Sequence, residues 1–212
     1  MNISVIIAHP GKRSFNHAIA QAAVEQLEHD GHAVSFHDLY EEHFDPLLTS
    51  EEILNGAVVP EMIAKQSREI ANAEGIVIIH PNWWGQPPAI LKGWVDRVLR
   101  CGVAYEFLEN DSGEGVPHGL LKARAAIVFN TSNTETERER KVFGDPLELI
   151  WKNCIFRLCG VGTIHRSTFS TVITSTDAQR QQWLNQARKD VASLFPNQCT
   201  SSPEERKHHE QH

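Results

Sequence analysis

Short runs rich in isoleucine and valine alternate along this chain with longer segments in which apolar residues recur every three or four positions. The clearest run is Gly-Ile-Val-Ile-Ile at residues 75–79, which is continuously apolar. A strand of this kind is covered on both faces, as in a parallel sheet with helices on each side. The alternation therefore predicts an α/β protein built as a doubly wound sheet.

The alternation predicts five parallel strands joined by helices. The expected strands are residues 3–8, 33–39, 75–79 and 125–130, with a fifth inside residues 164–174. The expected helices lie at about residues 14–28, 63–73, 89–99, 145–158 and 176–194, where apolar side chains share one face. The apolar face of the helix at 145–158 is expected to comprise Leu147, Ile150, Trp151, Cys154, Ile155 and Leu158.

Capping residues mark three helix starts. Thr-Ser-Glu-Glu at residues 49–52 has the spacing of a capping box and predicts a short helix inside the long connection 40–60. Asp145 before Pro146 predicts a helix with Asp as N-cap and Pro in the first turn. Residues 176–179, Thr-Asp-Ala-Gln, are expected to cap the last helix.

The chain has 212 residues, of which 41% are hydrophobic and 22% charged, a size and composition that suit one domain. We place this domain at residues 1–196. Residues 197–212 are polar and charged, so we expect a disordered tail there. The tail histidines, His208, His209 and His212, are expected to be solvated rather than metal-bound, because nothing fixes a ligand geometry.

Charge and cysteine spacing narrow the functional classes. The net charge of -7 and the lack of a long basic run argue against a nucleic-acid surface. Residues 1–8 have no basic region and too short an apolar run for a signal peptide or membrane span, so we expect a cytoplasmic protein. The sequence contains no Cys-x-x-Cys pair. We therefore expect its four cysteines to be buried, reduced thiols: Cys101, Cys154, Cys159 and Cys199.

In an open parallel sheet, ligands bind outside the carboxyl ends of the strands, where the strand order reverses. Three loops are therefore expected to converge on any ligand, at residues 9–16, 81–88 and 131–138. The sequence contains no Gly-x-Ser-x-Gly elbow, which disfavours a hydrolase. It also lacks a His-Glu-x-x-His cluster, and no metal site is expected in the folded part.

The first loop runs into a helix start, where unpaired N–H groups and the helix dipole favour an anion. Lys12, Arg13 and the Ser14 hydroxyl can add donors. The loop is neither a Gly-x-Gly-x-x-Gly fingerprint nor a Walker loop. The simpler interpretation is that Ser14 only caps the helix.

The other two loops suggest a flat ring with a polar edge. Adjacent Trp83 and Trp84 at the end of a strand suit a planar aromatic ligand, although one of them can instead pack in the core. The hydroxyl and amide groups of Thr131, Ser132 and Asn133 can hydrogen-bond a polar ring edge, although a plain turn has the same composition. An anion site, an aromatic surface and a donor-rich loop together predict a flavin site.

At these residues the chain resembles the flavodoxin-like NAD(P)H:quinone oxidoreductases, which include DT-diaphorase-like enzymes, bacterial modulators of drug activity and potassium-efflux ancillary proteins. The likeness covers about residues 3–194, and the run 81–98 is its most specific part, followed by Ser14-Phe15-Asn16 after Ala8-His9. The resemblance implies a flavodoxin-like three-layer sandwich whose five-stranded parallel sheet has the order 2-1-3-4-5. It also implies a homodimer with the active site at the subunit interface.

The resemblance further implies where FAD or FMN would bind. The phosphate and ribityl region would be lined by His9, Ser14, Phe15 and Asn16. The isoalloxazine would be flanked by Pro81, Asn82, Trp83, Trp84 and Gly85, with Trp83 or Trp84 stacking on a visiting acceptor. The pyrimidine edge would be approached by Thr131, Ser132 and Asn133.

The expected activity is transfer of two electrons from NAD(P)H through the flavin to a quinone or similar small aromatic acceptor. Glu137 and Phe143 stand where the animal enzymes have the tyrosine and histidine that serve hydride transfer, which leaves the acceptor open. One alternative is a flavin-bound regulatory subunit of a membrane transport system, with a peripheral membrane-protein partner. Another is an α/β domain without flavin.

Overall fold

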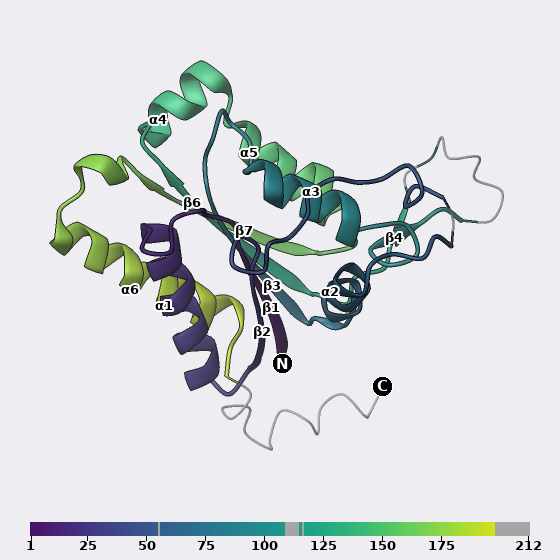
Figure 1. Ribbon diagram of the computed structural model, residues 1–212. Helices are drawn as coiled ribbons and strands as arrows, with labels where there is room; N and C mark the ends of the chain where they lie inside the picture. The colour runs from purple at the N-terminus through teal and green to yellow at the C-terminus, as the bar shows by residue number, and fades with distance from the viewer. Residues whose placement is uncertain (55, 109–114, 116, 198–212) are drawn as a thin grey trace, which may run out of the picture.

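The computed structural model describes residues 1–54, 56–108, 115 and 117–197. Its central sheet consists of β1 (Asn2–Ile7), β2 (Ala33–Asp38), β3 (Gly75–Pro81), β6 (Ala125–Ser132) and β7 (Thr163–Ser170). The strands pair in parallel in the order β2-β1-β3-β6-β7 (Figure 1). This confirms the predicted order 2-1-3-4-5, with the two short strands β4 (Tyr105–Glu106) and β5 (His118–Gly119) outside the sheet.

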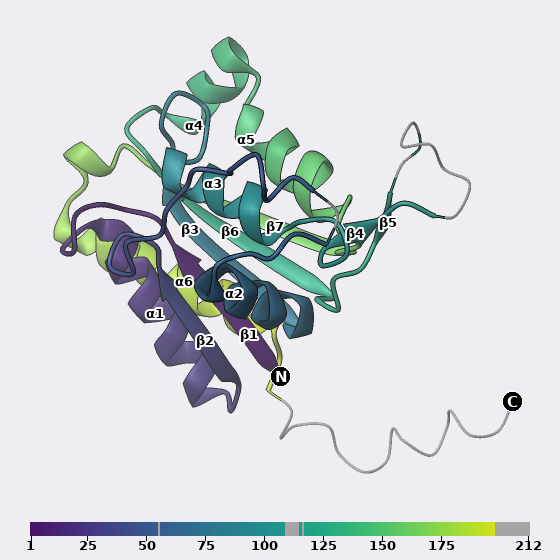
Figure 2. The ribbon, with the colours of Figure 1, turned by 45° about the vertical axis from the view of Figure 1, so that its right-hand side comes forward.

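Helices cover both faces of this sheet, which confirms the three-layer sandwich. One face carries α1 (Phe15–His29) and α6 (Asp177–Leu194) (Figure 1). The other carries α2 (Glu61–Asn72), α3 (Ala89–Val98) and α5 (Pro146–Leu149), which continues as the π-helix η2 (Ile150–Phe156) (Figure 2). The remaining helical segments are α4 (Thr136–Arg138), η1 (Glu139–Phe143) and η3 (Val172–Thr174).

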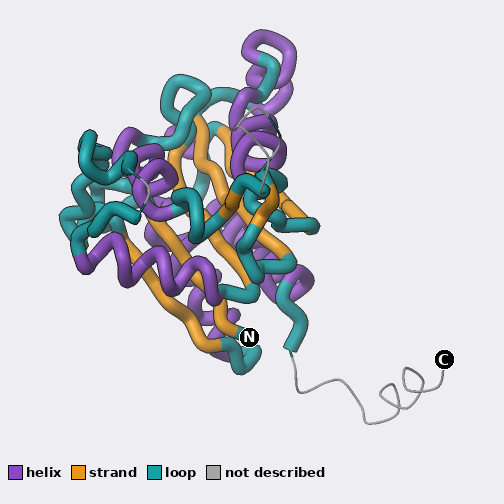
Figure 3. The backbone as a smooth tube through the Cα atoms, turned by 90° about the vertical axis from the view of Figure 1, so that its right-hand side faces the viewer, coloured by secondary structure: helices purple, strands orange, loops and turns teal. Residues whose placement is uncertain are grey.

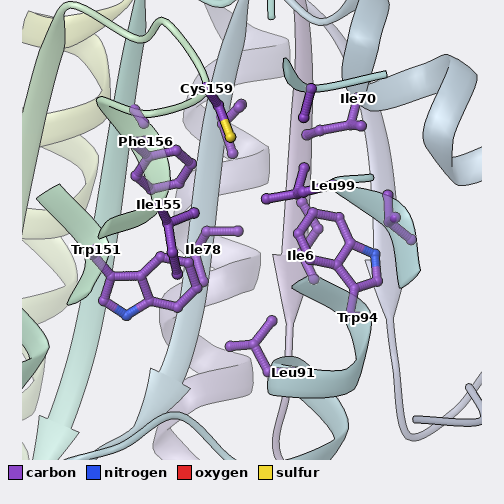
Figure 4. Packing of buried hydrophobic residues seen from close by; sticks show 14 of the residues in the cluster. Ile6, Ile70, Ile78, Leu91, Trp94, Leu99, Trp151, Ile155, Phe156 and Cys159 are labelled. Carbon is purple, nitrogen blue, oxygen red and sulfur yellow. The ribbon is translucent and has the colours of Figure 1, made fainter. Parts of the chain in front are cut away.

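The hydrophobic core lies in two layers, one on each side of the sheet. All seven residues of β3 are buried, as its continuous apolar run predicts. On the α3 side, Trp94 and the η2 residue Trp151 pack into one cluster with Ile6 and Ile78 of the strands (Figure 4). Burial of a large apolar side chain contributes about 1.5–3 kcal/mol, so this layer holds the α3 and η2 helices firmly against the sheet.

The strand register brings three carboxyl ends to one edge of the sheet. Ile7 of β1 pairs with Ile79 of β3, and Pro81 of β3 pairs with Thr131 of β6. The chain begins at the opposite end of these strands (Figure 3). The loops that follow β1, β3 and β6 therefore start next to one another.

Two helix starts follow the predicted capping. Ser14 Oγ accepts a hydrogen bond of 3.3 Å from the N–H of His17, and Thr176 Oγ1 accepts one of 3.2 Å from the N–H of Gln179. Each cap satisfies one N–H group that has no partner within its helix.

The prediction of a helix that begins at residues 49–52 is wrong. The described residues 40–54 and 56–60 form turns, such as the one closed by Glu52 N–H donating to Thr49 O at 3.2 Å, and no helix. In a capping box, the Glu52 carboxylate would accept from the N–H of Thr49. Both of its oxygens instead bind the Arg97 guanidinium, which no local pattern reveals.

The helix after Asp145 departs from the predicted winding. Asp145 has a left-handed backbone (φ 49°), and its carboxylate binds Arg166 rather than the helix N–H groups. From Ile150 onward the helix is π-wound, which changes the residues that face the core. Cys154 is consequently exposed, while Phe156 is buried.

The expectation of buried thiols holds for one of three described cysteines. Cys101 and Cys154 are exposed, and Cys159 is buried, which raises the pKa of its thiol to about 11. All three are free thiols. Cys199 and the tail histidines lie outside the described residues, so the expected tail at 197–212 and its domain boundary stay predictions.

The segment of residues 109–116, apart from residue 115, lies outside the described part of the chain. Beside it lies an unpredicted antiparallel pair, β4 (Tyr105–Glu106) and β5 (His118–Gly119), visible at the right of Figure 2. Strands of two residues are too short to produce a periodic signal. None of the helices described in the structure is both long and apolar enough to cross a membrane.

Candidate functional site

A cavity of about 580 Å³ opens at the carboxyl ends of β1, β3 and β6, and we call it the edge cavity. Residues of all three predicted loops line it: His9, Ser14, Phe15, Asn16, Pro81, Asn82, Trp83, Trp84, Gly85, Thr131, Ser132 and Asn133. Its lining is completed by Thr134, Glu139, Phe143, Pro146 and Val172. The three loops thus converge on one space, as expected from the topology.

Arg13 is the exception among the residues expected at this cavity. Residues 11–14 form a turn in which the N–H of Ser14 donates to the carbonyl of Gly11 at 2.9 Å. This turn leaves Arg13 exposed and outside the cavity lining. Lys12 is also exposed and forms an ion pair with Glu41. Neither cation contributes to the cavity wall.

The start of α1 forms one wall of the edge cavity. The hydrogen bonds of the helix begin at the N–H of His17, so the N–H groups of Phe15 and Asn16 have no partner within the helix. Together with the helix dipole, these groups favour a negative charge at this wall.

His9 lies beside this helix start in a neutral form. Burial lowers the pKa of His9, and the N–H of Gly11 donates to its Nδ1 at 3.0 Å. Because Nδ1 is then an acceptor, the ring hydrogen is placed on Nε2. The His9 ring is tilted against the Trp83 indole with 6.3 Å between their centroids, which joins the first loop to the second.

A series of hydrogen-bonded side chains that the sequence did not indicate supports Ser14. The Ser14 Oγ lies 2.8 Å from His17 Nδ1, and His17 Nε2 lies 2.9 Å from an Asp38 carboxylate oxygen. Asp38 ends β2, the neighbour of β1, so only the folded sheet brings it beside α1. This hydrogen-bonded series fixes the position of the Ser14 hydroxyl at the cavity wall.

Thr131 joins the three loops at the floor of the cavity. Its Oγ1 accepts a hydrogen bond of 2.9 Å from Asn16 Nδ2, and both side chains are buried. Its carbonyl accepts one of 2.7 Å from the N–H of Asn82. One residue of β6 therefore binds both the start of α1 and the loop after β3.

The second loop presents its tryptophans on a tight turn. Trp83 and Gln86 exchange backbone hydrogen bonds of 3.1 and 3.0 Å, and the central residues Trp84 and Gly85 both have positive φ (58° and 70°). This is a type I′ turn, a conformation that suits glycine and strains tryptophan. Trp84 is fully exposed, while Trp83 is 41% exposed. Strain of this kind is typical of functional sites.

Glycine is required at position 85 for a second reason. A Cβ there would lie 2.7 Å from Cγ of Pro146, closer than the atoms can approach. Asn82 Oδ1 also accepts a hydrogen bond of 2.9 Å from the N–H of Gly85, which holds the turn against the cavity.

The segment after β6 supplies Glu139, a cavity residue that the sequence did not indicate. Residues 131–138 were expected to form a loop, but residues 131–132 end β6 and residues 136–138 form α4. The π-helix η1 follows, and its residues Glu139 and Phe143 line the cavity. Glu137 is exposed, lies outside the cavity and pairs with Lys141 at 2.6 Å. The Glu137–Lys141 spacing is typical of a helix surface and could have shown that Glu137 faces outward.

A buried polar network lies behind the cavity wall. His80 is completely buried, its Nδ1–H donates to the Pro81 carbonyl at 2.8 Å, and its Nε2 accepts from Trp151 Nε1–H at 2.9 Å. Burial, with a smaller effect of the nearby Arg166 charge, lowers the pKa of His80 to about 4, so the ring is neutral at neutral pH. The network holds the end of β3, and with it Pro81, in place.

Arg166 of β7 anchors the far end of this network. Its guanidinium donates to the Asn130 amide oxygen at 3.0 Å, to Glu148 at 2.8 Å and to Asp145. The Asp145 contact holds the left-handed turn that places Pro146 in the cavity wall.

A second cavity of about 630 Å³ lies between α2, the carboxyl end of α3 and the connection that contains residues 48–59; we call it the side cavity. Arg97 and Glu52 line it and are paired with each other, with side chains only 4% and 5% exposed.

Among the residues that the structure describes, no group of three or more His, Cys, Asp or Glu side chains is placed to hold a metal.

Known proteins resemble this chain along nearly its whole length. A family model described as a flavodoxin-like fold matches residues 1–192. An uncharacterized NAD(P)H oxidoreductase of Haemophilus influenzae is 35% identical over 199 residues, which cover 92% of this chain and 96% of the relative. A ribosyldihydronicotinamide dehydrogenase (quinone) of Rattus norvegicus is 27% identical over 227 residues, covering 94% and 96%. A solved NAD(P)H:quinone oxidoreductase from Methanothermobacter marburgensis has a TM-score of 0.78 and 26% identity over 92% of this chain and 96% of that chain.

Proposed function

Because the chain belongs to the flavodoxin-like fold family, we propose that its edge cavity binds a flavin and makes it an NAD(P)H oxidoreductase that reduces a quinone or similar small aromatic acceptor. The relatives described above are named as oxidoreductases of this kind. A regulatory role beside a membrane transport system has no support among them and is not proposed.

One observation carries the proposal, namely the convergence of three chemically different loops on a single cavity. The α1 start offers N–H groups and the Ser14 hydroxyl, which suit a phosphate. The turn with Trp83 and Trp84 offers indole surfaces, which suit a planar ring. The third loop offers hydroxyl and amide groups, which suit the polar edge of that ring. These donors fit a flavin, either FMN or FAD.

We assign the residues accordingly. His9, Ser14, Phe15 and Asn16 would hold the phosphate and ribityl region. Pro81, Asn82, Trp83, Trp84 and Gly85 would flank the ring, and Thr131, Ser132 and Asn133 would hydrogen-bond its polar edge. Arg13 is left out of this set because it lies outside the cavity lining.

A bound flavin would supply the two-electron chemistry, accepting a hydride and later passing two electrons on. The chain binds the flavin and its reaction partners and orients them toward one another. The hydroxyl and amide groups at residues 131–133 are placed by β6 before any ligand arrives, so they can stabilise negative charge at the ring edge without reorganisation.

NAD(P)H and the acceptor would use the cavity in turn. Both present a flat ring, and the aromatic turn of residues 83–86 gives such a ring one surface on which to stack. Successive occupancy of the same surface corresponds to a ping-pong cycle, in which the oxidised nicotinamide leaves before the acceptor enters.

We also propose that a second copy of the chain covers the mouth of the edge cavity. Exposed apolar side chains gather on the segments that line it: Trp84, Val142, Phe143, Leu149 and Ile173. Exposed apolar patches of this kind commonly mark protein interfaces. Sedimentation of the purified protein should give the mass of a dimer, and a monomer at all concentrations would contradict this part of the proposal.

Spectroscopy and turnover of the purified protein test the proposed function. We expect flavin absorption, directly or after reconstitution with FMN and FAD, and oxidation of NADH or NADPH that menadione accelerates. A protein that binds neither flavin after reconstitution would contradict the proposal. Bound flavin without NAD(P)H oxidation would contradict the oxidoreductase assignment while leaving the cofactor site intact.

A further inference from the structure

Glu139 places a carboxylate in the wall of the edge cavity. Among the cavity-lining residues that the structure describes, it is the only one with an acidic side chain, and no lysine or arginine lines the cavity. Glu139 is half-buried and begins the π-helix η1. The sequence does not single out Glu139, because Glu135 and Glu137 lie in the same short segment. Both of these are exposed and outside the cavity lining.

The carboxylate is held in place by a neutral partner. Asn82 Nδ2 donates to Glu139 Oε1 at 3.0 Å, and the other end of the same amide accepts from the N–H of Gly85. Glu139 is therefore tied to the turn that presents Trp83 and Trp84. An amide holds the carboxylate without neutralising its charge.

Among the described residues, Glu139 forms no ion pair within 4 Å, and its chain neighbours Arg138 and Arg140 are exposed and outside the cavity lining. Lys141 pairs with Glu137 on the outer surface, and Arg166 is bound by Asp145 and Glu148 behind the cavity. The groups of the chain that favour an anion lie at the start of α1, on the other side of the sheet from α5, into which the Glu139 segment leads. The cavity thus has one wall that attracts negative charge and one that repels it.

We propose that Glu139 makes the edge cavity select uncharged or cationic aromatic acceptors over anionic ones, an inference that rests on the proposed function of the same cavity. An anionic ring substituent that approaches the Trp83–Gln86 turn meets an uncompensated carboxylate, whereas an uncharged quinone meets none. For two charges a few ångströms apart at a partly solvated wall, screened repulsion corresponds to about five- to tenfold in affinity.

The variant Glu139→Gln tests this directly, because glutamine keeps an oxygen that can accept from Asn82 and removes only the charge. Glu137→Gln is the matched control, since it removes the same charge two residues away and outside the cavity. For each protein, kcat/KM is measured with menadione and with a naphthoquinone sulfonate. The dissociation constants of both quinones are also measured by quenching of tryptophan fluorescence, without NAD(P)H.

The preference is the ratio of kcat/KM for menadione to kcat/KM for the sulfonate. We expect this ratio to fall about five- to tenfold in Glu139→Gln and to stay unchanged in Glu137→Gln. Added salt should shrink the preference of the original protein and have less effect on Glu139→Gln. An unchanged preference in Glu139→Gln, or an equal change in both variants, would overturn the inference.

The two assays separate this inference from the proposed function. Menadione turnover with no change of preference would overturn the role of Glu139 and leave the proposed function standing. If neither quinone is reduced, the proposed function fails, and the fluorescence titration still decides: selective gain of sulfonate binding in Glu139→Gln supports the charge effect, and equal binding overturns it.

Discussion

The edge cavity and the side cavity are nearly equal in volume, about 580 and 630 Å³, but their polar groups are used differently. In the side cavity, Arg97 binds both carboxylate oxygens of Glu52 and the carbonyl of Asp45. In the edge cavity, Asn16 and Thr131 are also bonded to each other, but the first N–H groups of α1 have no partner within the helix and Trp84 is fully exposed. Groups bonded to one another stabilise the fold, whereas groups turned toward open space can bind a ligand.

This contrast teaches that volume alone does not identify a site. The Arg97 guanidinium also lies 5.9 Å from the centre of the Phe44 ring, so its charge is engaged on several sides. The edge cavity instead has a strained turn, a helix start and a half-buried carboxylate around one space. Four variants test the difference between the two cavities.

The largest expected effect is on stability, from Arg97→Met at the side cavity. Removal of the guanidinium leaves the Glu52 carboxylate buried without its partner, which should cost about 3–5 kcal/mol of unfolding free energy. Urea unfolding measures the loss, and flavin affinity of the folded protein should not change. The double variant with Glu52→Leu should recover part of the loss. A cost below about 1 kcal/mol would show that the pair is not structural.

The next effect concerns acid sensitivity behind the edge cavity. His80 has a folded pKa of about 4 against an ordinary value of 6.5, so between these values the unfolded chain binds a proton that the folded chain does not. The unfolding free energy should therefore fall as pH drops from 6.5 toward 4, by about 3 kcal/mol in total from this group. In His80→Asn this part of the pH dependence should disappear. An identical pH profile in the variant would contradict a neutral buried His80.

Asn16→Ala tests whether the contact between the loops prepares the edge cavity. Loss of the bond to Thr131 should cost about 1–2 kcal/mol of stability and lower flavin affinity by about tenfold. Ser67→Ala is the matched control, because it removes a buried side-chain hydrogen bond, to the Val98 carbonyl, at the side cavity. Flavin titration should separate the two variants. Equal weakening of flavin binding in both would remove the distinction between the cavities.

The smallest expected effect on stability is a gain, from Trp84→Gly. Glycine adopts positive φ without strain, so the unfolding free energy should rise by about 1 kcal/mol, since a fully exposed indole contributes no burial. The KM for aromatic acceptors should rise because a stacking surface is lost. A variant that is more stable and equally active would show that the strained turn has no role in binding.

The sheet order was implied by the family resemblance, and the sequence itself was sufficient for the five strands and for the meeting of the three loops. Both depend on local patterns, such as the apolar run of β3 and the capping residue Ser14, combined with the geometry of parallel strands. The orientation of Arg13 and the windings of η1 and η2 could not be obtained in this way. Arg13 lies in the turn of residues 11–14, whose direction no periodicity indicates. The π-winding of η2 adds one residue to a helical turn and moves Cys154 out of the core.

Nonlocal partners were also beyond the sequence patterns. The pairing of Glu52 with Arg97 replaced a predicted helix cap, and Asp38 reached Ser14 only through His17. Glu52 binds a partner across the fold instead of capping its own segment, whereas Asp38 accepts from the N–H groups of Tyr40 and Glu41 and also binds His17. Sequence periodicity carries no information about such choices.

A crystal structure of the protein grown with FMN or FAD would show whether the edge cavity is the flavin site. We expect the flavin in the edge cavity, with its phosphate at the start of α1, its ring beside the Trp83–Gln86 turn and its polar edge at residues 131–133. A flavin bound in the side cavity, or an edge cavity without flavin at a saturating concentration, would contradict this expectation.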